Sequence, residues 1–120
     1  MADLATIEVN RHDNAVVAVI HGDVDLSNID VVRRKLDAAL EAGTIRHIVD
    51  LTHTTFIDSV GIHLLFALAE SLRTRRQELR IAVPDESSVA RVLRLTDVPS
   101  VIPMFSDVAG ALAATDDFNF

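Results

Sequence analysis

The sequence has no cysteine, no tryptophan and no tyrosine among its 120 residues. Without cysteine, disulfide scaffolds, thiolate metal sites and thiol nucleophiles are all excluded. The aromatic content is 4%, and most of the five phenylalanines lie in apolar runs, so the chain lacks the stacking platforms that hold single-stranded nucleic acid. A formal net charge of −7 also repels phosphate backbones. We therefore expect no direct binding to nucleic acid.

Long hydrophobic runs are absent too. No run approaches the roughly 20 apolar residues that a membrane-spanning helix needs. The start, Met1-Ala2-Asp3-Leu4, lacks the basic region and apolar segment of a secretory leader. Hydrophobic residues make up 49% of the chain and charged residues 24%, which is typical of a globular protein. We expect one cytoplasmic domain over residues 1–120, with no association with membranes.

Short apolar runs alternate with helical spacings along the chain. Strands are predicted at residues 6–9 and 15–20, which would form an N-terminal hairpin, and at 48–51, 79–83 and 101–102. Helices are predicted at residues 29–40, ending near Gly43, then at 59–76, 88–95 and 108–114, with a polar loop at 52–55 and a frayed tail at 115–120. The order ββαβαβαβα predicts an α/β domain with a mainly parallel central sheet and about four helices.

The stretch Phe56-Ile57-Asp58-Ser59-Val60-Gly61-Ile62 is the main candidate for function, because a helix should begin near its acid and its hydroxyl. Asp58 or Ser59 could cap an unpaired backbone N–H there, and the positive end of the helix dipole would tolerate a phosphate. Gly61 would let a partner approach the backbone closely. The stretch is therefore either only a helix cap or a modifiable serine on a docking surface.

Two predicted loops should lie beside each other at this stretch. Functional loops of a mainly parallel sheet gather at the carboxyl ends of its strands. The loop of residues 22–27 and the loop of residues 52–59 both follow strands at that end. We therefore expect Asp23 and Asp25 to lie near Asp58.

Three segments in this order resemble a known family. They are Gly22-Asp23-Val24-Asp25 after an apolar strand, Arg46-His47-Ile48-Val49, and Phe56-Ile57-Asp58-Ser59-Val60-Gly61. Together they are similar to the STAS-domain anti-sigma factor antagonists of bacteria, and the resemblance covers about residues 15–105. One departure is Val60, where many relatives have Ser or Thr, so a second hydroxyl that could support or replace the first is missing.

The resemblance implies a STAS fold and a regulatory binding protein with no catalysis and no cofactor of its own. The partner would be an anti-sigma factor that is also a serine kinase of the GHKL type, and Ser59 matches the residue that this kinase phosphorylates in the family. The unphosphorylated antagonist would bind the anti-sigma factor and free the sigma factor, and a metal-dependent serine phosphatase would reset it.

The docking surface would comprise Asp23, Asp25 and the run Asp58-Ser59-Val60-Gly61-Ile62. Asp25, which matches a loop aspartate of the family, would orient the site or contact the kinase. The alternative is that it only caps the first helix. A phosphate on Ser59 would add about −1.5 to −2 charge beside these carboxylates and so weaken docking without a change of fold.

Other readings of the sequence have less support. The five histidines show no spacing typical of a metal site. An acid–base enzyme using Asp25 and Asp58 would need a pocket and a positioned partner. Ser59 does not match a Gly-x-Ser-x-Gly nucleophile, because Ile57 stands where the first glycine is required. The runner-up is a STAS scaffold or partner-binding subunit of a sensory assembly, without a phosphorylation switch. Oligomeric state stays open, since the second apolar face of the helix over residues 60–69 leaves room for a partner.

Overall fold

The computed structural model describes residues 5–12, 14–40 and 45–114. In this part of the chain the strands are β1 (Thr6–His12), β2 (Ala15–Val24), β3 (Arg46–Asp50), β4 (Thr54–Ile57), β5 (Glu78–Ala82) and β6 (Met104–Phe105). The helices are α1 (Ile29–Ala39), α2 (Ser59–Thr74), α3 (Ser88–Leu95) and α4 (Val108–Ala113), with a 3-10 turn η1 at Val98–Ser100. The prediction of an α/β domain with an N-terminal hairpin and four helices is confirmed. The predicted tail and the helix end at Gly43 lie outside the described residues.

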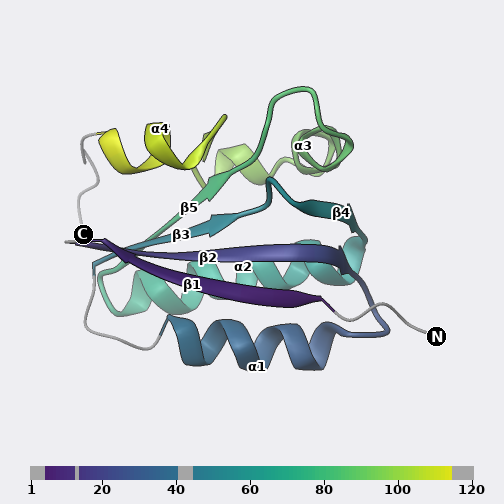
Figure 1. The fold of residues 1–120 in the computed structure, drawn as a ribbon, viewed down its shortest axis with the longest axis horizontal. Helices are drawn as coiled ribbons and strands as arrows, with labels where there is room; N and C mark the ends of the chain where they lie inside the picture. Colours follow the sequence, from purple (N-terminus) through teal and green to yellow (C-terminus); the bar gives the residue numbers. More distant parts are fainter. Residues whose placement is uncertain (1–4, 13, 41–44, 115–120) are drawn as a thin grey trace.

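The strands form a six-stranded sheet with the order β1-β2-β3-β5-β6 (Figure 1). β1 runs antiparallel to β2, and the pairs β2–β3, β3–β5 and β5–β6 are parallel. β2 is long enough to serve two neighbours, because residues 15–19 pair with β3 whereas residues 22–24 pair with β4. Its register shifts between Gly22 and Asp23, and Gly22 has a φ of 98°, which glycine adopts without steric cost.

The prediction of a loop at residues 52–55 is wrong, because Thr54 and Thr55 begin β4. Their polarity suggested a turn, but threonine is β-branched and suits a strand. Thr54 is buried, and its hydroxyl donates to the carbonyl of Ile20 at 2.9 Å, which satisfies the polar group inside the protein. The prediction also ended β2 too early, since the strand continues past Ile20 to pair with β4.

Two other predicted boundaries are corrected. The last strand is β6 rather than residues 101–102, because Ile102 turns into the core and the chain pairs with β5 only from the Pro103 carbonyl, which accepts from Ile81 N at 2.9 Å. β6 lies at the edge of the sheet, as Pro103 beside it suggested. α2 ends at Thr74, so Arg75 and Arg76 follow the helix instead of forming its last turn.

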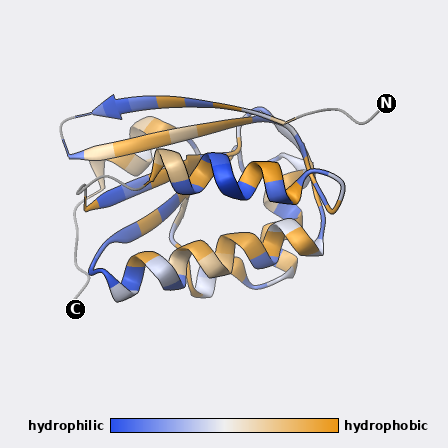
Figure 2. Ribbon diagram, turned by 90° about the horizontal axis from the view of Figure 1, so that it is seen from below, coloured by the Kyte–Doolittle hydropathy of each residue, from blue (hydrophilic) through white to orange (hydrophobic). Residues whose placement is uncertain are grey.

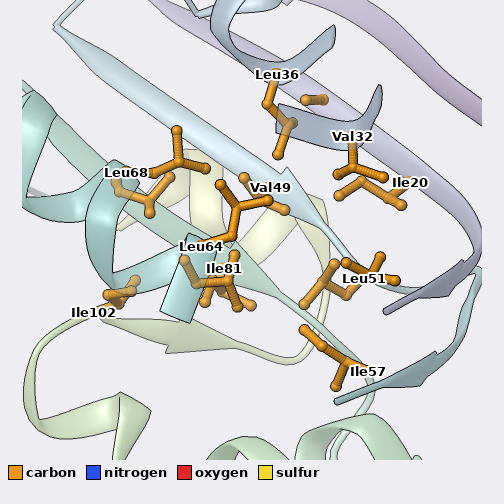
Figure 3. Close-up of a cluster of buried hydrophobic side chains, with 14 of the residues drawn as sticks. Ile20, Val32, Leu36, Val49, Leu51, Ile57, Leu64, Leu68, Ile81 and Ile102 are labelled. Atoms are coloured by element: carbon orange, nitrogen blue, oxygen red, sulfur yellow. The ribbon is translucent and has the colours of Figure 1, made fainter. Parts of the chain in front are cut away.

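The core has two unequal parts. α1 and α2 cover one face of the sheet, where Ile20, Val49 and Ile81 from the strands meet side chains such as Leu36 and Leu68 from the helices (Figure 3). α4 covers the other face, and α3 packs beside β4. Viewed from the helix side, α2 is hydrophobic over most of its length, whereas α1 alternates (Figure 2).

A buried arginine on β5 holds α4 in place. Arg80 is 2% exposed, and its Nη1 donates to the carbonyls of Ala111 and Ala114 at the end of α4. Its guanidinium also pairs with Glu78 at 3.1 Å and lies 5.5 Å from the ring centre of Phe105. The charge therefore stabilises a helix C-terminus, where cations are favourable.

Candidate functional site

Asp58 and Ser59 lie where the sequence places them, at the junction between β4 and α2. Asp58 is extended and caps the helix, because its Oδ1 accepts from the backbone N–H of Gly61 at 3.0 Å. Ser59 is the first residue of α2, and its side chain is exposed to solvent. The cap and the accessible hydroxyl are thus provided by two adjacent residues, and the cap does not occupy the serine.

The carboxylate of Asp58 also joins α2 to a second loop. Its Oδ2 accepts from the backbone N–H of Leu26 at 3.1 Å, and the backbone N–H of Asp58 donates to the carbonyl of Val24 at 3.2 Å. The end of β2, the loop before α1 and the start of α2 are therefore connected through one residue. The expectation that this loop lies beside Asp58 is confirmed.

Short hydrogen bonds shape the loop that carries Asp23 and Asp25. The hydroxyl of Thr55 donates to Asp23 Oδ1 at 2.5 Å, so β4 fixes that carboxylate. Asp25 Oδ1 accepts from the backbone N–H of Ser27 at 2.9 Å and from its hydroxyl at 2.5 Å. Asp25 therefore orders the loop and does not cap α1, so that alternative is wrong. The N-cap residue of α1 is Asn28, a buried side chain that donates to the carbonyl of Asp23 at 2.7 Å.

The structure divides the predicted docking residues into two groups. Asp23, Asp25, Asp58 and Val60 are partly exposed and Ser59 is exposed, whereas Gly61 and Ile62 are buried. The expected opening beside Gly61 is already filled. A Cβ at that position would lie 2.6 Å from Cγ1 of Ile57 and 3.0 Å from Cγ1 of Val24. The glycine allows α2 to pack on β4 and β2, and the idea that it leaves space for a partner is not supported.

Sequence reasoning missed two exposed apolar side chains at this site. Leu26, whose backbone is bonded to Asp58, is 72% exposed, and Phe56, two residues before Asp58 on β4, is 50% exposed. Single exposed apolar side chains are common on protein surfaces, whereas neighbouring ones rimmed by polar groups mark interaction sites. The available signal was that each stands within a polar segment, Leu26 between Asp25 and Ser27, and Phe56 after the threonines.

The electrostatics of the site are one-sided. Asp23, Asp25 and Asp58 accept hydrogen bonds from neutral donors. The ion pairs found among the described residues lie elsewhere, for example between Arg73 and Glu70. A negative group added at Ser59 would therefore join a surface that already carries uncompensated negative charge.

Two other features are absent from the part of the chain that the structure describes. No cluster of three or more histidine, aspartate or glutamate side chains there could ligate a metal ion. None of the helices there has both the length and the apolar character required to cross a bilayer.

Comparison with known proteins agrees with the geometry. The STAS domain family matches residues 6–111. The anti-sigma F factor antagonist of Paenibacillus polymyxa is 23% identical over 107 residues, which cover 88% of this chain and 91% of that protein. The crystal structure of an anti-sigma factor antagonist from Mycobacterium paratuberculosis has a TM-score of 0.81 at 22% identity, covering 90% of this chain and 91% of the other.

The Bacillus cell fate determinant SpoIIAA, in its phosphorylated form, has the same fold, with a TM-score of 0.62 at 17% identity over 89% of this chain and 96% of the other. The element order, the position of the Asp58–Ser59 junction and the match over most of the chain lead to one conclusion. The chain belongs to the STAS domain family.

Proposed function

We propose that this STAS-domain protein is an anti-sigma factor antagonist whose binding is switched off by phosphorylation of Ser59. The observation that carries the proposal is an exposed serine hydroxyl at the start of α2, on a surface that also presents the exposed side chains of Leu26 and Phe56. Two relatives named as anti-sigma factor antagonists, and a phosphorylated protein of the same fold, support it.

The partner is a cytoplasmic anti-sigma factor that is also a serine kinase of the GHKL type, and a metal-dependent serine phosphatase restores the active form. The chain itself is a substrate and a binding protein, not an enzyme. When it occupies the anti-sigma factor, the sigma factor is free, so transcription changes without contact between this chain and DNA.

The switch acts through charge. A phosphate on Ser59 would add about −1.5 to −2 charge. It would lie next to Asp58, whose carboxylate is bonded to the loop that carries Asp23 and Asp25. Leu26 and Phe56 can be buried by a partner only if the neighbouring polar groups are desolvated as well. Desolvating a dianion is costly, and like charges across or within an interface cost several kcal/mol. Docking is therefore lost while the fold is kept.

The proposal is tested with the purified protein, the anti-sigma kinase encoded in the same genome, and ATP. Intact-mass analysis should show one addition of about 80 daltons, and Ser59→Ala should abolish it. Ser71→Ala removes the hydroxyl of another exposed serine, about three helical turns further along α2, and should leave the addition in place. Calorimetry should show that the phosphorylated protein binds the anti-sigma factor about 100-fold or more weakly, which corresponds to the several kcal/mol expected for juxtaposed like charges.

Phosphate that persists in Ser59→Ala would overturn the assignment of the acceptor. If the unmodified protein binds no anti-sigma factor and a pull-down returns only other STAS proteins, the chain is instead a scaffold without a phosphorylation switch. The two outcomes are separate, because the first concerns the modified residue and the second concerns the partner.

A further inference from the structure

A groove of about 710 Å³ lies beside the C-terminal half of α2, away from Ser59. Its apolar lining comes from Phe66 and Ala69 on α2, Leu79 on β5, and Val101 and Pro103 before β6. Val101 is 59% exposed. The chain thus leaves an apolar surface open at a second place.

The groove continues the surface that contains Ser59. Positions 59, 63, 66, 70 and 73 are spaced by alternating steps of four and three residues, so they share one face of α2. None of the five is buried, and the last three line the groove. About two helical turns, or roughly 10 Å, separate Ser59 from Phe66. A partner seated on Ser59 that extends along α2 therefore reaches the groove.

The far end of the groove carries a strained cation. Arg76 has a φ of 60°, at the position after the helix where glycine is usual, and Gln77 N donates to the carbonyl of Leu72 at 2.8 Å to close the turn. A side chain in this conformation lowers stability relative to glycine. Arg73 in the same groove is bound by Glu70 at 2.8 Å. Arg76 is exposed and makes no side-chain hydrogen bond or ion pair within the described residues.

Residues with a strained backbone are concentrated at functional sites. Here the residue with the strained backbone places at the end of the groove a guanidinium that has no ion pair among the described residues, on a chain whose net charge is −7. We propose that the groove receives a segment of the anti-sigma factor that presents apolar side chains followed by a carboxylate, which pairs with Arg76. The inference rests on the proposed function, because it names a second contact with the same partner.

The decisive variant is Arg76→Gly, because it should move stability and affinity in opposite directions. Relief of the strained backbone should raise the melting temperature by about 2–4 °C. Loss of the guanidinium should weaken binding of the unphosphorylated protein to the anti-sigma factor by about 3–10-fold. Asp97→Gly is the matched control. Asp97 has a φ of 63° but does not line the groove, so its replacement should leave the affinity unchanged.

A second pair of variants tests the apolar lining. Val101→Asp places a like charge where the carboxylate-bearing segment would pack, and should weaken binding by about 10-fold or more. Leu95→Asp is the control, since Leu95 is 77% exposed and lies outside the groove. Both positions are exposed enough to accept aspartate without unfolding the protein.

The outcomes separate this inference from the proposed function. If the anti-sigma factor binds the wild-type protein and phosphorylation of Ser59 weakens binding, but Arg76→Gly and Val101→Asp change nothing, the groove contact is refuted and the proposed function stands. If no anti-sigma factor binds the wild-type protein, both fail. If ultracentrifugation shows a dimer that Val101→Asp dissociates, the occupant is a second copy and the inference is overturned.

Discussion

Replacing Gly61 with alanine tests whether the start of α2 is closely packed. The added Cβ would lie 2.6 Å from Cγ1 of Ile57 and 3.0 Å from Cγ1 of Val24. Real Cβ atoms essentially never approach other atoms below 3.0 Å, so at least one side chain must shift. Ile57 and Val24 are 4% and 2% exposed, and their strands pair at these two residues, so a shift of either side chain would disturb its buried neighbours.

Two opposing effects set the size of the change in the free energy of unfolding. Alanine in place of glycine inside a helix gains at most about 1 kcal/mol. Overpacking a closed site costs about 1–3 kcal/mol. We expect the free energy of unfolding of Gly61→Ala to fall by about 1–2 kcal/mol, because the short contact lies on buried strand residues. For a chain of this length that lowers the melting temperature by roughly 3–8 °C.

Gly110→Ala is a control at the same position of another helix. Asp107 caps α4 by accepting from Gly110 N, as Asp58 caps α2 by accepting from Gly61 N. Among the described residues, a Cβ at Gly110 would meet the capping oxygen at 3.1 Å and Cβ of Phe105 at 3.9 Å. The free energy of unfolding of Gly110→Ala should equal that of the wild-type protein or exceed it by up to about 1 kcal/mol. Calorimetric melting of both variants tests this difference. If Gly61→Ala stabilised the protein as much as Gly110→Ala does, the packing argument would be refuted.

Two further predictions concern polar contacts that hold the fold. Asp58→Asn keeps the cap on Gly61 and loses the bond from Leu26, whereas Asp58→Ala loses both, so urea unfolding should show losses of about 0.5–1 and 1–2 kcal/mol; an unchanged stability of Asp58→Asn would mean that the loop bond contributes nothing, and equal losses would mean that the cap contributes nothing. Arg80→Met removes the donors that hold the end of α4, and should cost about 3–5 kcal/mol because a buried charge pair is broken. Hydrogen exchange should then be faster throughout α4, and unchanged protection there would contradict the role given to Arg80.

The parallel sheet was predictable because its buried strands appear as short apolar runs. β4 was not, because its burial is neither continuous nor alternating: Thr54 and Ile57 are inside, while Thr55 and Phe56 face solvent. The strand exists only because β2 extends beyond Gly22 and supplies a partner for it. Pairing between segments some 30 residues apart is a tertiary effect that a local pattern cannot contain.

The candidate site was predictable only where it depends on residues that are neighbours in the sequence. An aspartate and a serine at the start of a helix are visible in the sequence, because capping depends on neighbouring residues. The exposure of Leu26 and Phe56 and the burial of Gly61 depend on how three segments meet. The groove beside α2 brings together residues 66–79 and 101–103. Its strained Arg76 is identified by its backbone dihedral angle, which residue type alone did not indicate.

The hydrogen bonds of Asp58 explain why a phosphate on Ser59 would act strongly without refolding the protein. A helix N-terminus usually neutralises a phosphate with its unpaired backbone N–H groups. Here Asp58 already accepts the N–H of Gly61, and its other oxygen accepts the N–H of Leu26. The N–H of Asp58 itself is bonded to the carbonyl of Val24. Fewer donors are left for a phosphate, so more of its charge would face the partner, and the fold that holds Asp58 has no reason to change.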